Sequence, residues 1–419
     1  MVIKKRDGFD LGPILKQLTE TRTVNQGGSV SYPIGTREKF ESYFITATQA
    51  EGKSAAFVGY VVKRAMSAEQ VLDEKKFIGH ANRIANRLES NRKPMKVVFP
   101  VWGSKGLMGD SRQWGGVRIS FDVDIKSRFL RRAQRERLEQ IERRGRGTVL
   151  QGDDFSNLPL AVCSVKAINA FDAFELAESA ISTELGLYSL IFSRRRNLLL
   201  SGSSERPIST ILLAPHMTVH DPTGKLFSDV FWFNPWPNGQ RAVSRTQDDV
   251  KKIQESVATL RKQVRKLPWR SMAELALARH YEAFSQKDLE ASFLDGWRLL
   301  EAIGGGAREK SETLVRRAAW FFEEPLEWTQ YGLHLMHRRN LISHGRPVRA
   351  DDNEGLAFQM KEFLTPMLLA VLTNPYGLKS IEEFWDFCDL PTDQGNRNKK
   401  RHILNRQLHL LQCAAKFRR

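Results

Sequence analysis

Cysteine is scarce in this sequence of 419 residues, which contains three: Cys163, Cys388 and Cys413. They lie far apart, and no pair has the short spacing of a zinc-binding knuckle. An odd number of scattered cysteines also argues against a framework of disulfide bonds. The sequence therefore indicates a reducing, cytoplasmic setting.

Long apolar runs are also missing. No uninterrupted apolar stretch approaches the ~18 residues that a membrane-spanning helix needs, and the basic N-terminus "MVIKKRDGFDLGP" has no apolar run behind it. We therefore expect a soluble protein with no stable membrane insertion. Because 41% of the residues are apolar and 10% aromatic, the chain can form true hydrophobic cores. Its length predicts two domains, with room for a third.

Acidic residues are rare in two segments that hold most of the net charge of +17. Lys126 to Arg146 contains nine Lys or Arg against three Glu, and Pro391 to Arg419 contains eight against one Asp, so these segments carry +6 and +7. Such clusters are typical of proteins that bind a polyanion. The alternative is a solvated basic helix and a loose tail. The candidate RNA contacts share one side of a predicted helix: Arg128, Arg131, Arg132 and Arg135.

The first 245 residues predict a mixed α/β domain. Runs rich in Val, Ile and Phe predict strands at Lys96 to Gly103, Gly116 to Ile125, Pro159 to Ile168, Ile208 to His216 and Lys225 to Phe233. A helix is predicted to begin at the capping box "SAEQ", with Ser67 as the cap, and to end near Ser90. A second helix is predicted from Phe171 to about Phe192. The class is therefore α+β or α/β, and the topology stays open.

From Thr246 onward every segment has the pattern of a helix. The predicted helices are Thr246 to Arg265, Ser271 to Phe284, Asp288 to Ile303, Glu309 to Phe322, Leu326 to His344 and Asp352 to Leu372. Short amphipathic helices with short connections predict an antiparallel bundle. We therefore expect an α+β protein with a mixed domain at 1–245, an all-α bundle at 246–390 and a basic C-terminal helix or tail at 391–419.

The stretch "HRRNLISHGRPV", His337 to Val348, places a histidine at the end of the fifth of these helices. Asn340 and His344 are four residues apart and share a helix face, while Arg339 lies on the flank. Gly345 and Pro347 are the residue types that follow a helix end. Histidine is the side chain best suited to acid–base chemistry near neutral pH, so His344 is a candidate catalytic group.

The same spacing also occurs where no site is expected. Basic residues are ordinary in a last helical turn, because they complement the free carbonyls and the helix dipole. The stretch "SRRRNLLLSG", Ser193 to Gly202, repeats the arginine and asparagine but has Ser201 where the histidine would stand. The histidine is therefore what distinguishes the candidate site.

The segment "RRNLISHG" resembles the Arg-x4-to-6-His signature of the HEPN superfamily, in the form that has a polar residue after the arginine. The upstream segment "SFLDGWRLLEAIGG", Ser292 to Gly305, is similar to the preceding bundle helix of the ApeA-like branch. The resemblance covers roughly Thr246 to Leu372. It implies a HEPN-like helical bundle that works as a metal-independent endoribonuclease and as a homodimer, with no metal ion and no cofactor.

The resemblance also implies roles for individual residues. Arg339 matches the signature arginine, Asn340 the polar residue after it, and His344 the histidine. Arg338 is a rival match with one more intervening residue. Glu301 corresponds to the acidic residue of the upstream helix, with a salt bridge inside the bundle as the equally good alternative, and His337 is a supporting residue beside the motif.

The expected chemistry is RNA cleavage by attack of the 2′-OH on the adjacent phosphorus. His344 supplies a base or an acid, and Arg339 has a planar fork that matches phosphate oxygens. One motif contains one signature histidine, whereas the reaction needs an acid and a base, which predicts a two-fold dimer with a composite site. The resemblance associates such proteins with antiviral defence and toxin systems, with transfer RNA as a frequent target and a phage-derived or other trigger.

Two alternatives from other classes remain open. The first is a non-catalytic HEPN-like module that binds RNA or a protein through the basic clusters. The second is a DNA-binding regulator, for which the sequence shows no helix-turn-helix signal. A metal site at His216 and His220 is not expected, because their i,i+4 spacing falls at a predicted strand end, where the two rings do not converge.

Overall fold

The computed structural model describes residues 3–26, 29–68, 73–103, 106–108, 111–121, 127–144, 158–193, 206–234, 246–306, 309–345 and 350–417. It is a mixed α+β protein, as the sequence predicted. The chain divides into two compact units. Unit 1 comprises Met1–Val101, Met108–Ile181 and Leu213–Pro235, and unit 2 comprises Trp102–Leu107, Ser182–Leu212 and Trp236–Arg419. The sequence predicted one boundary near residue 245, whereas the structure also assigns Ser182–Leu212 to the helical unit.

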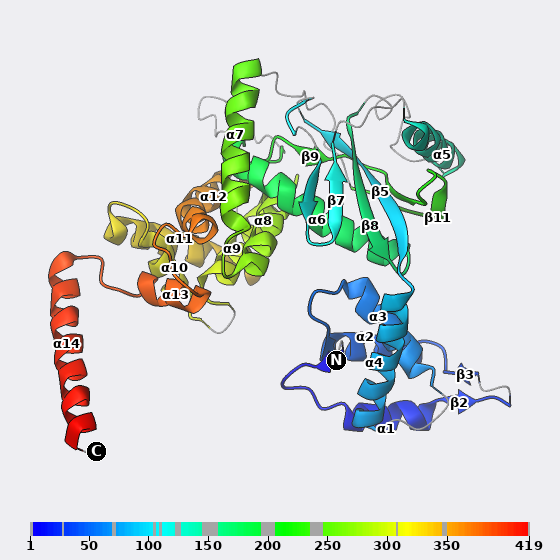
Figure 1. Cartoon of the computed structure of the whole chain (residues 1–419), viewed down its shortest axis with the longest axis horizontal. Coiled ribbons are helices and arrows are strands. Elements are labelled where there is room, and N and C mark those ends of the chain that lie inside the picture. Colours follow the sequence, from blue (N-terminus) through cyan, green and yellow to red (C-terminus); the bar gives the residue numbers. More distant parts are fainter. Residues whose placement is uncertain are drawn as a thin grey trace. The chain divides into compact units, whose positions relative to one another are not determined.

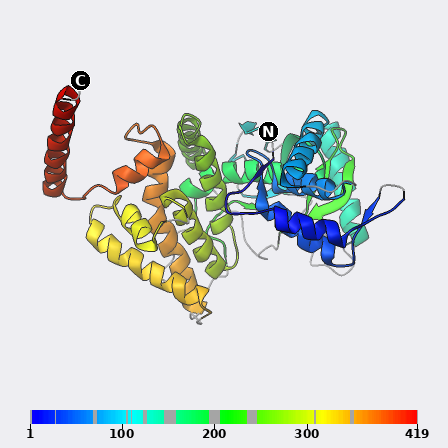
Figure 2. The same cartoon turned by 90° about the horizontal axis from the view of Figure 1, so that it is seen from below.

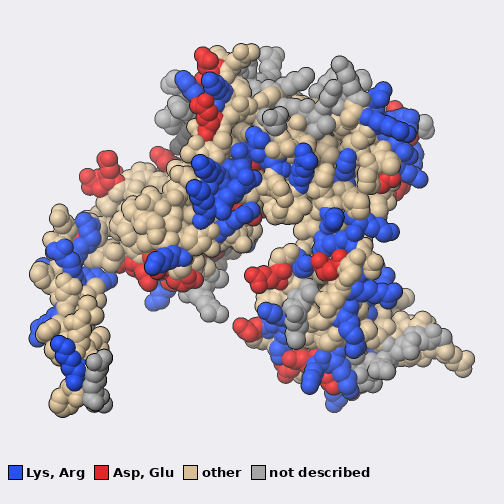
Figure 3. All heavy atoms as spheres, in the orientation of Figure 1, with Lys and Arg blue, Asp and Glu red and all other residues tan. Residues whose placement is uncertain are grey.

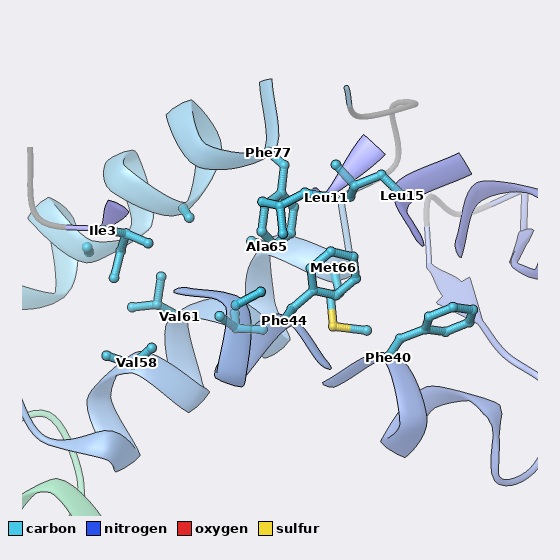
Figure 4. Close-up of a cluster of buried hydrophobic side chains, with 14 of the residues drawn as sticks. Ile3, Leu11, Leu15, Phe40, Phe44, Val58, Val61, Ala65, Met66 and Phe77 are labelled. Carbon is cyan, nitrogen blue, oxygen red and sulfur yellow. The ribbon is translucent and has the colours of Figure 1, made fainter. Parts of the chain in front are cut away.

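Unit 1 begins with four helices and four two-residue strands. The helices are α1 (Gly12–Thr21), α2 (Thr36–Ala47), α3 (Ala55–Met66) and α4 (Glu74–Ser90). The strands are β1 (Lys4–Lys5), β2 (Thr23–Val24), β3 (Val30–Ser31) and β4 (Thr48–Gln49), which pair as β1 with β4 and β2 with β3. The helices enclose a hydrophobic cluster in which the ring centroids of Phe44 and Phe77 lie 4.9 Å apart (Figure 4).

The predicted capping box at Ser67 was wrong. Ser67 is the C-cap of α3, and its hydroxyl donates to the Lys63 carbonyl at 3.1 Å, so it closes one helix rather than opening the next. The following helix, α4, begins at Glu74. Its N-cap is Asp73, whose carboxylate accepts from the Lys76 N–H at 2.7 Å.

The rest of unit 1 is built around an antiparallel sheet. The strands are β5 (Lys93–Trp102), β6 (Arg112–Trp114), β7 (Val117–Ser120), β8 (Leu160–Ala167), β9 (Leu212–Leu213), β10 (Met217–His220) and β11 (Leu226–Trp232). Among the described residues the order is β11-β10-β5-β8-β7-β6, and β9 pairs with β5. Two helices flank the sheet, α5 (Arg128–Arg144) and α6 (Ala170–Ile191) (Figure 1).

The two helices cover opposite faces of the sheet. Val98 of β5 packs in a cluster with Leu130 and Ala133 of α5, while its neighbour Phe99 contacts Phe174 of α6 at 5.8 Å between ring centroids. Successive side chains of a strand point to opposite faces, so α5 and α6 lie on different sides. β5 is therefore buried on both faces, which explains its nearly continuous apolar sequence.

The strand predicted from Ile208 to His216 was wrong in its extent. Only Leu212–Leu213 pairs as a strand in this stretch. His216 has a φ of 66°, a left-handed conformation that interrupts extended backbone, and pairing resumes at Met217. No sequence pattern predicted the left-handed conformation of His216.

Unit 2 contains eight helices after residue 246 in the part of the chain that the structure describes. They are α7 (Gln247–Val264), α8 (Arg270–Phe284), α9 (Leu289–Gly304), α10 (Ser311–Ala319), α11 (Pro325–Ser343), α12 (Ala350–Thr373), α13 (Ile381–Cys388) and α14 (Gln394–Phe417). The first six match the predicted helices to within three residues. Thr246 and Asp288 cap α7 and α9 through their side chains.

Helix α9 lies at the centre of unit 2. It packs most extensively against α12 and α8, while α10 packs against α11 (Figure 2). The second half of α6 belongs to this unit because Gly186 allows it to approach α8 closely: a Cβ at Gly186 would stand 2.2 Å from the Leu277 carbonyl oxygen. Glu184 of α6 and Arg261 of α7 form a buried ion pair of 2.5 Å. Helix α14 buries none of its residues.

Candidate functional site

Helix α11 carries the predicted motif at its C-terminal end. The helix ends at Ser343, and His344 is the C-cap, with its N–H donating to the Asn340 carbonyl at 3.1 Å. Gly345 follows with a φ of 69°, the left-handed conformation that favours glycine after a helix. Its N–H donates to the Ile342 carbonyl at 2.9 Å. The histidine thus lies at the helix terminus, and Pro347 lies outside the described residues.

Arg339 joins the end of α11 to α9. Its Nη2 donates to Glu301 Oε1 at 2.9 Å, and its guanidinium carbon lies 5.8 Å from the centroid of the Trp297 ring. Trp297 is buried, and its indole N–H donates to the same Glu301 Oε1 at 2.8 Å. One carboxylate oxygen therefore accepts two hydrogen bonds, and the arginine fork is held against an aromatic ring at a distance typical of a cation–π contact. We call Glu301, Trp297 and Arg339 the arginine clasp.

Asn340 extends this clasp rather than contacting the imidazole through its side chain. Its Oδ1 accepts from Arg339 Nη1 at 3.1 Å, while its backbone carbonyl accepts from the His344 N–H. The shared helix face predicted that Asn340 lies beside the ring of His344, either to orient the ring or to share its substrate. The structure shows it orienting the arginine instead, since neighbouring residues on a helix end can meet through long side chains.

The two rival arginines have different surroundings. Arg339 contacts Glu301, and among the described residues Arg338 shows no ion pair with that carboxylate. The charge of Arg338 instead acts on His334, one turn earlier on α11: burial lowers the pKa of His334, and the nearby charges of Arg338 and His337 lower it further. Of the two, Arg339 is therefore the arginine that the α9 carboxylate positions.

The two histidines of the motif are open to solvent. His337 and His344 are both exposed, whereas Arg339 and Glu301 are half-buried. A positioned cation and an exposed imidazole thus occur within one turn and a half of each other on α11. This arrangement suits an anionic substrate that approaches the end of the helix from outside.

A cavity of about 440 Å³ lies beside the clasp. Its walls come from α8, α9 and the residues that follow α9: Arg279, Glu282, Asp295, Arg298, Glu301, Ala302 and Gly306. Burial raises the pKa of Glu282, an effect that Arg279 opposes and Asp295 reinforces. Arg298 donates to Asp295 Oδ1 at 2.6 Å. Glu301 is therefore shared between the arginine clasp and a polar cavity that has room for a small group.

The candidate RNA-binding arginines lie on helix α5, as the periodicity indicated. Arg128, Arg131 and Arg135 are exposed, and Arg132 is half-buried. Lys and Arg side chains gather over this helix in Figure 3. Intrahelical carboxylates offset part of the charge: Arg132 lies 3.6 Å from Glu136. Arg135 lies 3.7 Å from Glu139.

Arg137 of the same helix differs from its neighbours. It is buried, it donates to the His216 carbonyl at 2.8 Å, and burial lowers its pKa to about 10. His216 and His220 are buried as well, with pKa values lowered to about 3 and about 4, mainly by burial. The Nε2 of His220 lies 2.8 Å from Thr218 Oγ1, and its Nδ1 lies 3.0 Å from the Gly224 carbonyl oxygen. These side chains therefore lie in the interior of unit 1.

Trp297 is a member of the arginine clasp that the sequence did not predict. It lay in the segment "SFLDGWRLLEAIGG" but received no role. Its distance of four residues from Glu301 on a helix was the available signal, because that spacing brings two side chains together.

Comparison of the chain with protein-family models, with curated proteins and with solved structures gave no match. One described segment, Asn353–Thr373 in α12, is long and apolar enough to cross a membrane by length and composition. Of its most apolar window 67% is buried inside the structure, which is the pattern of a core helix.

Proposed function

We propose that this protein is a metal-independent endoribonuclease whose site is built on Arg339, Asn340, His344 and Glu301 in a HEPN-like bundle. The observation that carries the proposal is the arginine clasp: Glu301 of α9 fixes Arg339 one turn and a half before the exposed His344. The clasp joins the two sequence segments that resemble the HEPN superfamily.

The residue types match the demands of RNA transesterification. The 2′-OH must lose a proton as its oxygen bonds to the phosphorus, and the leaving 5′-oxygen must gain one. His344 carries out one of these proton transfers, and its exposed position admits a phosphodiester. Arg339 neutralises the charge that builds on the phosphate oxygens, since a guanidinium keeps its charge at any working pH.

Glu301 and Asn340 act as positioning residues in this scheme. The carboxylate and the amide oxygen each accept from one Nη of Arg339, so the orientation of the fork is fixed before substrate arrives. Holding a charge in place beforehand lowers the reorganisation that the reaction requires. Trp297 supports the same carboxylate from within the bundle.

A second copy of the chain completes the site in our proposal. Each chain contributes one signature histidine, whereas the reaction needs a base and an acid. The exposed end of α11 can face its equivalent across a two-fold axis, with His337 close to the junction. The products would be a 2′,3′-cyclic phosphate and a 5′-OH.

The basic surfaces fit a role in holding RNA. Arg128, Arg131, Arg132 and Arg135 on α5 offer backbone contacts, and α14 adds six Lys or Arg without any Asp or Glu. A cytoplasmic enzyme of antiviral defence or a toxin system, directed at transfer RNA and started by a phage-derived or other trigger, is the biological setting that the family resemblance favours.

One experiment separates this enzyme from a non-catalytic module. Purified protein and its Arg339→Ala and His344→Ala variants are incubated with bulk RNA in EDTA. We expect cleavage by the wild type and its loss in both variants. If the enzyme needs a trigger, expression of the wild type is toxic to cells and expression of either variant is not.

The alternative is a HEPN-like module that binds RNA or a protein without cleaving it. One observation favours this alternative: Arg339 already has a carboxylate partner, and such a salt bridge also occurs in helical bundles that have no catalytic site. RNA that stays intact both with the purified wild type and in cells that express it, together with binding that survives Arg339→Ala, would support the module.

A further inference from the structure

A groove of about 620 Å³ is lined entirely by residues of unit 1, along its sheet. Its lining includes four cations, Lys53, Arg92, Lys96 and Lys166, against one carboxylate, Glu89. Lys and Arg atoms gather where β5 begins and β8 ends (Figure 3). The size falls within the range of small-molecule sites, and the charge favours an anion.

Two of the four cations are already paired. Lys53 Nζ lies 2.9 Å from Glu89 Oε2, and Arg92 Nη2 lies 2.9 Å from Glu89 Oε1. Arg92 Nη1 also donates to the Lys166 carbonyl at 2.8 Å and lies 3.5 Å from Asp172 Oδ2. These contacts fix one wall of the groove and use the charge of Glu89, so Glu89 does not balance Lys96 or Lys166.

Lys96 is a partly buried cation without an acidic partner among the described residues. It lies on the central strand β5, and its Nζ stands 4.0 Å from the centroid of the Phe129 ring of α5. Burial lowers the pKa of Lys96, and no nearby charge contributes to that shift. A desolvated ammonium with no counter-ion costs free energy. An anion that binds in the groove beside Lys96 would offset this cost.

Lys166 stands on the same face as Lys96. In the register of β5 and β8, Lys96 is opposite Ser164, and Lys166 is two residues further along β8. Residues in this diagonal relationship are close enough for long side chains to reach one ligand. Lys166 is exposed, and the structure shows no ion pair for it within the described ranges. Two ammonium groups without carboxylates therefore face the groove together.

The remaining lining is largely apolar. On the face of the sheet that carries Lys96 it includes Pro94, two residues earlier on β5, and Pro222, which follows β10, also lines the groove. A free inorganic ion would make no use of such a wall, whereas a planar ring attached to a phosphate would bury against it. We propose that this groove binds a nucleotide, with the phosphate between Lys96 and Lys166 and the base against the apolar wall. The nucleotide is either free or the 5′-phosphorylated end of an RNA strand, and both present the same chemistry.

Calorimetric titration of the full-length protein with adenosine 5′-monophosphate, adenosine and inorganic phosphate tests the proposal. A 5′-phosphorylated and a 5′-hydroxyl oligoribonucleotide are titrated into the His344→Ala variant, in which the RNA is not cleaved. We expect saturable binding of at least one 5′-phosphorylated ligand and none of adenosine. Binding by the monophosphate assigns the site to a free nucleotide. Binding by the phosphorylated oligonucleotide alone assigns it to a strand end.

The matched variants are Lys96→Met, which keeps an unbranched side chain and removes the charge, and Lys93→Met, which removes an exposed cation of the same strand that does not line the groove. Loss of one charge-assisted hydrogen bond predicts about tenfold weaker binding by Lys96→Met. Lys93→Met should bind like the wild type. Thermal unfolding should show little change of stability in Lys96→Met, because the substitution removes a desolvated charge without a carboxylate partner along with its contact with the Phe129 ring.

Three outcomes would overturn the proposal. These are no saturable binding of any 5′-phosphorylated ligand, equal weakening by Lys96→Met and Lys93→Met, and inorganic phosphate binding as tightly as the nucleotide. The site is independent of RNA cleavage: Arg339→Ala should leave binding unchanged, so the nucleotide site and the ribonuclease proposal fail or succeed separately.

Discussion

Glu301 of α9 and Arg339 of α11 form an ion pair in which Oε1 and Nη2 lie 2.9 Å apart. The same oxygen accepts from the Trp297 indole, and the other Nη of Arg339 donates to Asn340. The clasp therefore couples the centre of the bundle to the residue that begins the Arg-x4-His motif.

Substitution of Arg339 should strongly slow RNA cleavage. We expect Arg339→Ala to lower kcat by about 10² to 10³, the loss typical of one preorganised charge-stabilising group. Arg338→Ala is the matched control, because it removes the same charge one residue earlier and leaves the contact with Glu301 intact. Cleavage rates of the two variants on one RNA decide the point. Equal losses would mean that general positive charge, and not the clasp, promotes cleavage.

Substitution of His344 should remove activity without affecting stability. The side chain is exposed and the cap contact is made by the backbone, so His344→Ala should change the free energy of unfolding by no more than about 0.5 kcal/mol. Loss of a general acid or base should lower kcat by about 10² to 10⁴. The exposed His337 provides the control variant His337→Ala. A His344→Ala protein with wild-type kcat would exclude His344 from the chemistry.

The ion pair itself should contribute little to stability. Both side chains are half-buried, so a double-mutant cycle with Glu301→Gln and Arg339→Gln should give a coupling free energy of about 0.2 to 1 kcal/mol. Glu301→Gln keeps an acceptor for Trp297 but weakens the hold on Arg339. We expect its kcat to fall while KM changes less. A coupling of several kcal/mol with unchanged kcat would make the clasp a purely structural feature.

The buried pair of Glu184 and Arg261 should contribute far more to stability. Its atoms are 2.5 Å apart, and both side chains are almost fully enclosed. Glu184→Gln leaves a buried guanidinium without its counter-ion, which should cost about 3 to 5 kcal/mol in urea unfolding. The more exposed pair of Glu274 and Arg270 is the control. Glu274→Gln should cost about 0.3 to 0.5 kcal/mol, and similar losses from both variants would contradict this assignment.

His280 should make unit 2 sensitive to acid. His280 is fully buried, its ring packs against Phe284, and the charge of Lys361 acts on it. Neither ring nitrogen of His280 forms a hydrogen bond with a described residue. Burial holds the pKa of His280 well below its usual value. The unfolded chain therefore binds more protons below pH ~6.5, so the free energy of unfolding falls as the pH falls from there.

Replacement of this histidine by an apolar ring should reduce the sensitivity. His280→Phe removes two unsatisfied nitrogens, so we expect higher stability at pH 7 and a flatter decline between pH 6.5 and 4. Urea unfolding of unit 2 at a series of pH values measures both effects. A variant whose stability declines as steeply as that of the wild type would show that other groups cause the acid sensitivity.

The helices of unit 2 could largely be predicted from the sequence, because helix caps and apolar periodicity are local signals. The sequence predicted two helices to begin at Thr246 and Asp288, which are the N-caps of α7 and α9, and the apolar period sets the lengths. The predicted cap at Ser67 failed because Asp73, six residues on, competes for the same role and the residues between carry no decisive pattern. The left-handed conformation of His216 depends on tertiary packing, so no local sequence pattern predicts it.

The candidate site was predictable in part for the same reason. Spacing placed His344 at the helix end, but it could not choose between Arg338 and Arg339, because that choice depends on the direction of α9 across the bundle. It also placed Asn340 beside the imidazole, whereas the reach of Arg339 brings the amide to the guanidinium. The pair of Glu184 and Arg261 lies 77 residues apart in sequence, beyond any local signal.

The chemistry of the RNA ends tests the central claim most directly. The wild type, Arg339→Ala and His344→Ala proteins are incubated in EDTA with one end-labelled RNA, and the termini of the fragments are identified. The account predicts 2′,3′-cyclic phosphate and 5′-OH ends with the wild type and intact RNA with both variants. Fragments with 3′-OH and 5′-phosphate ends, or the same fragments from all three proteins, would contradict it.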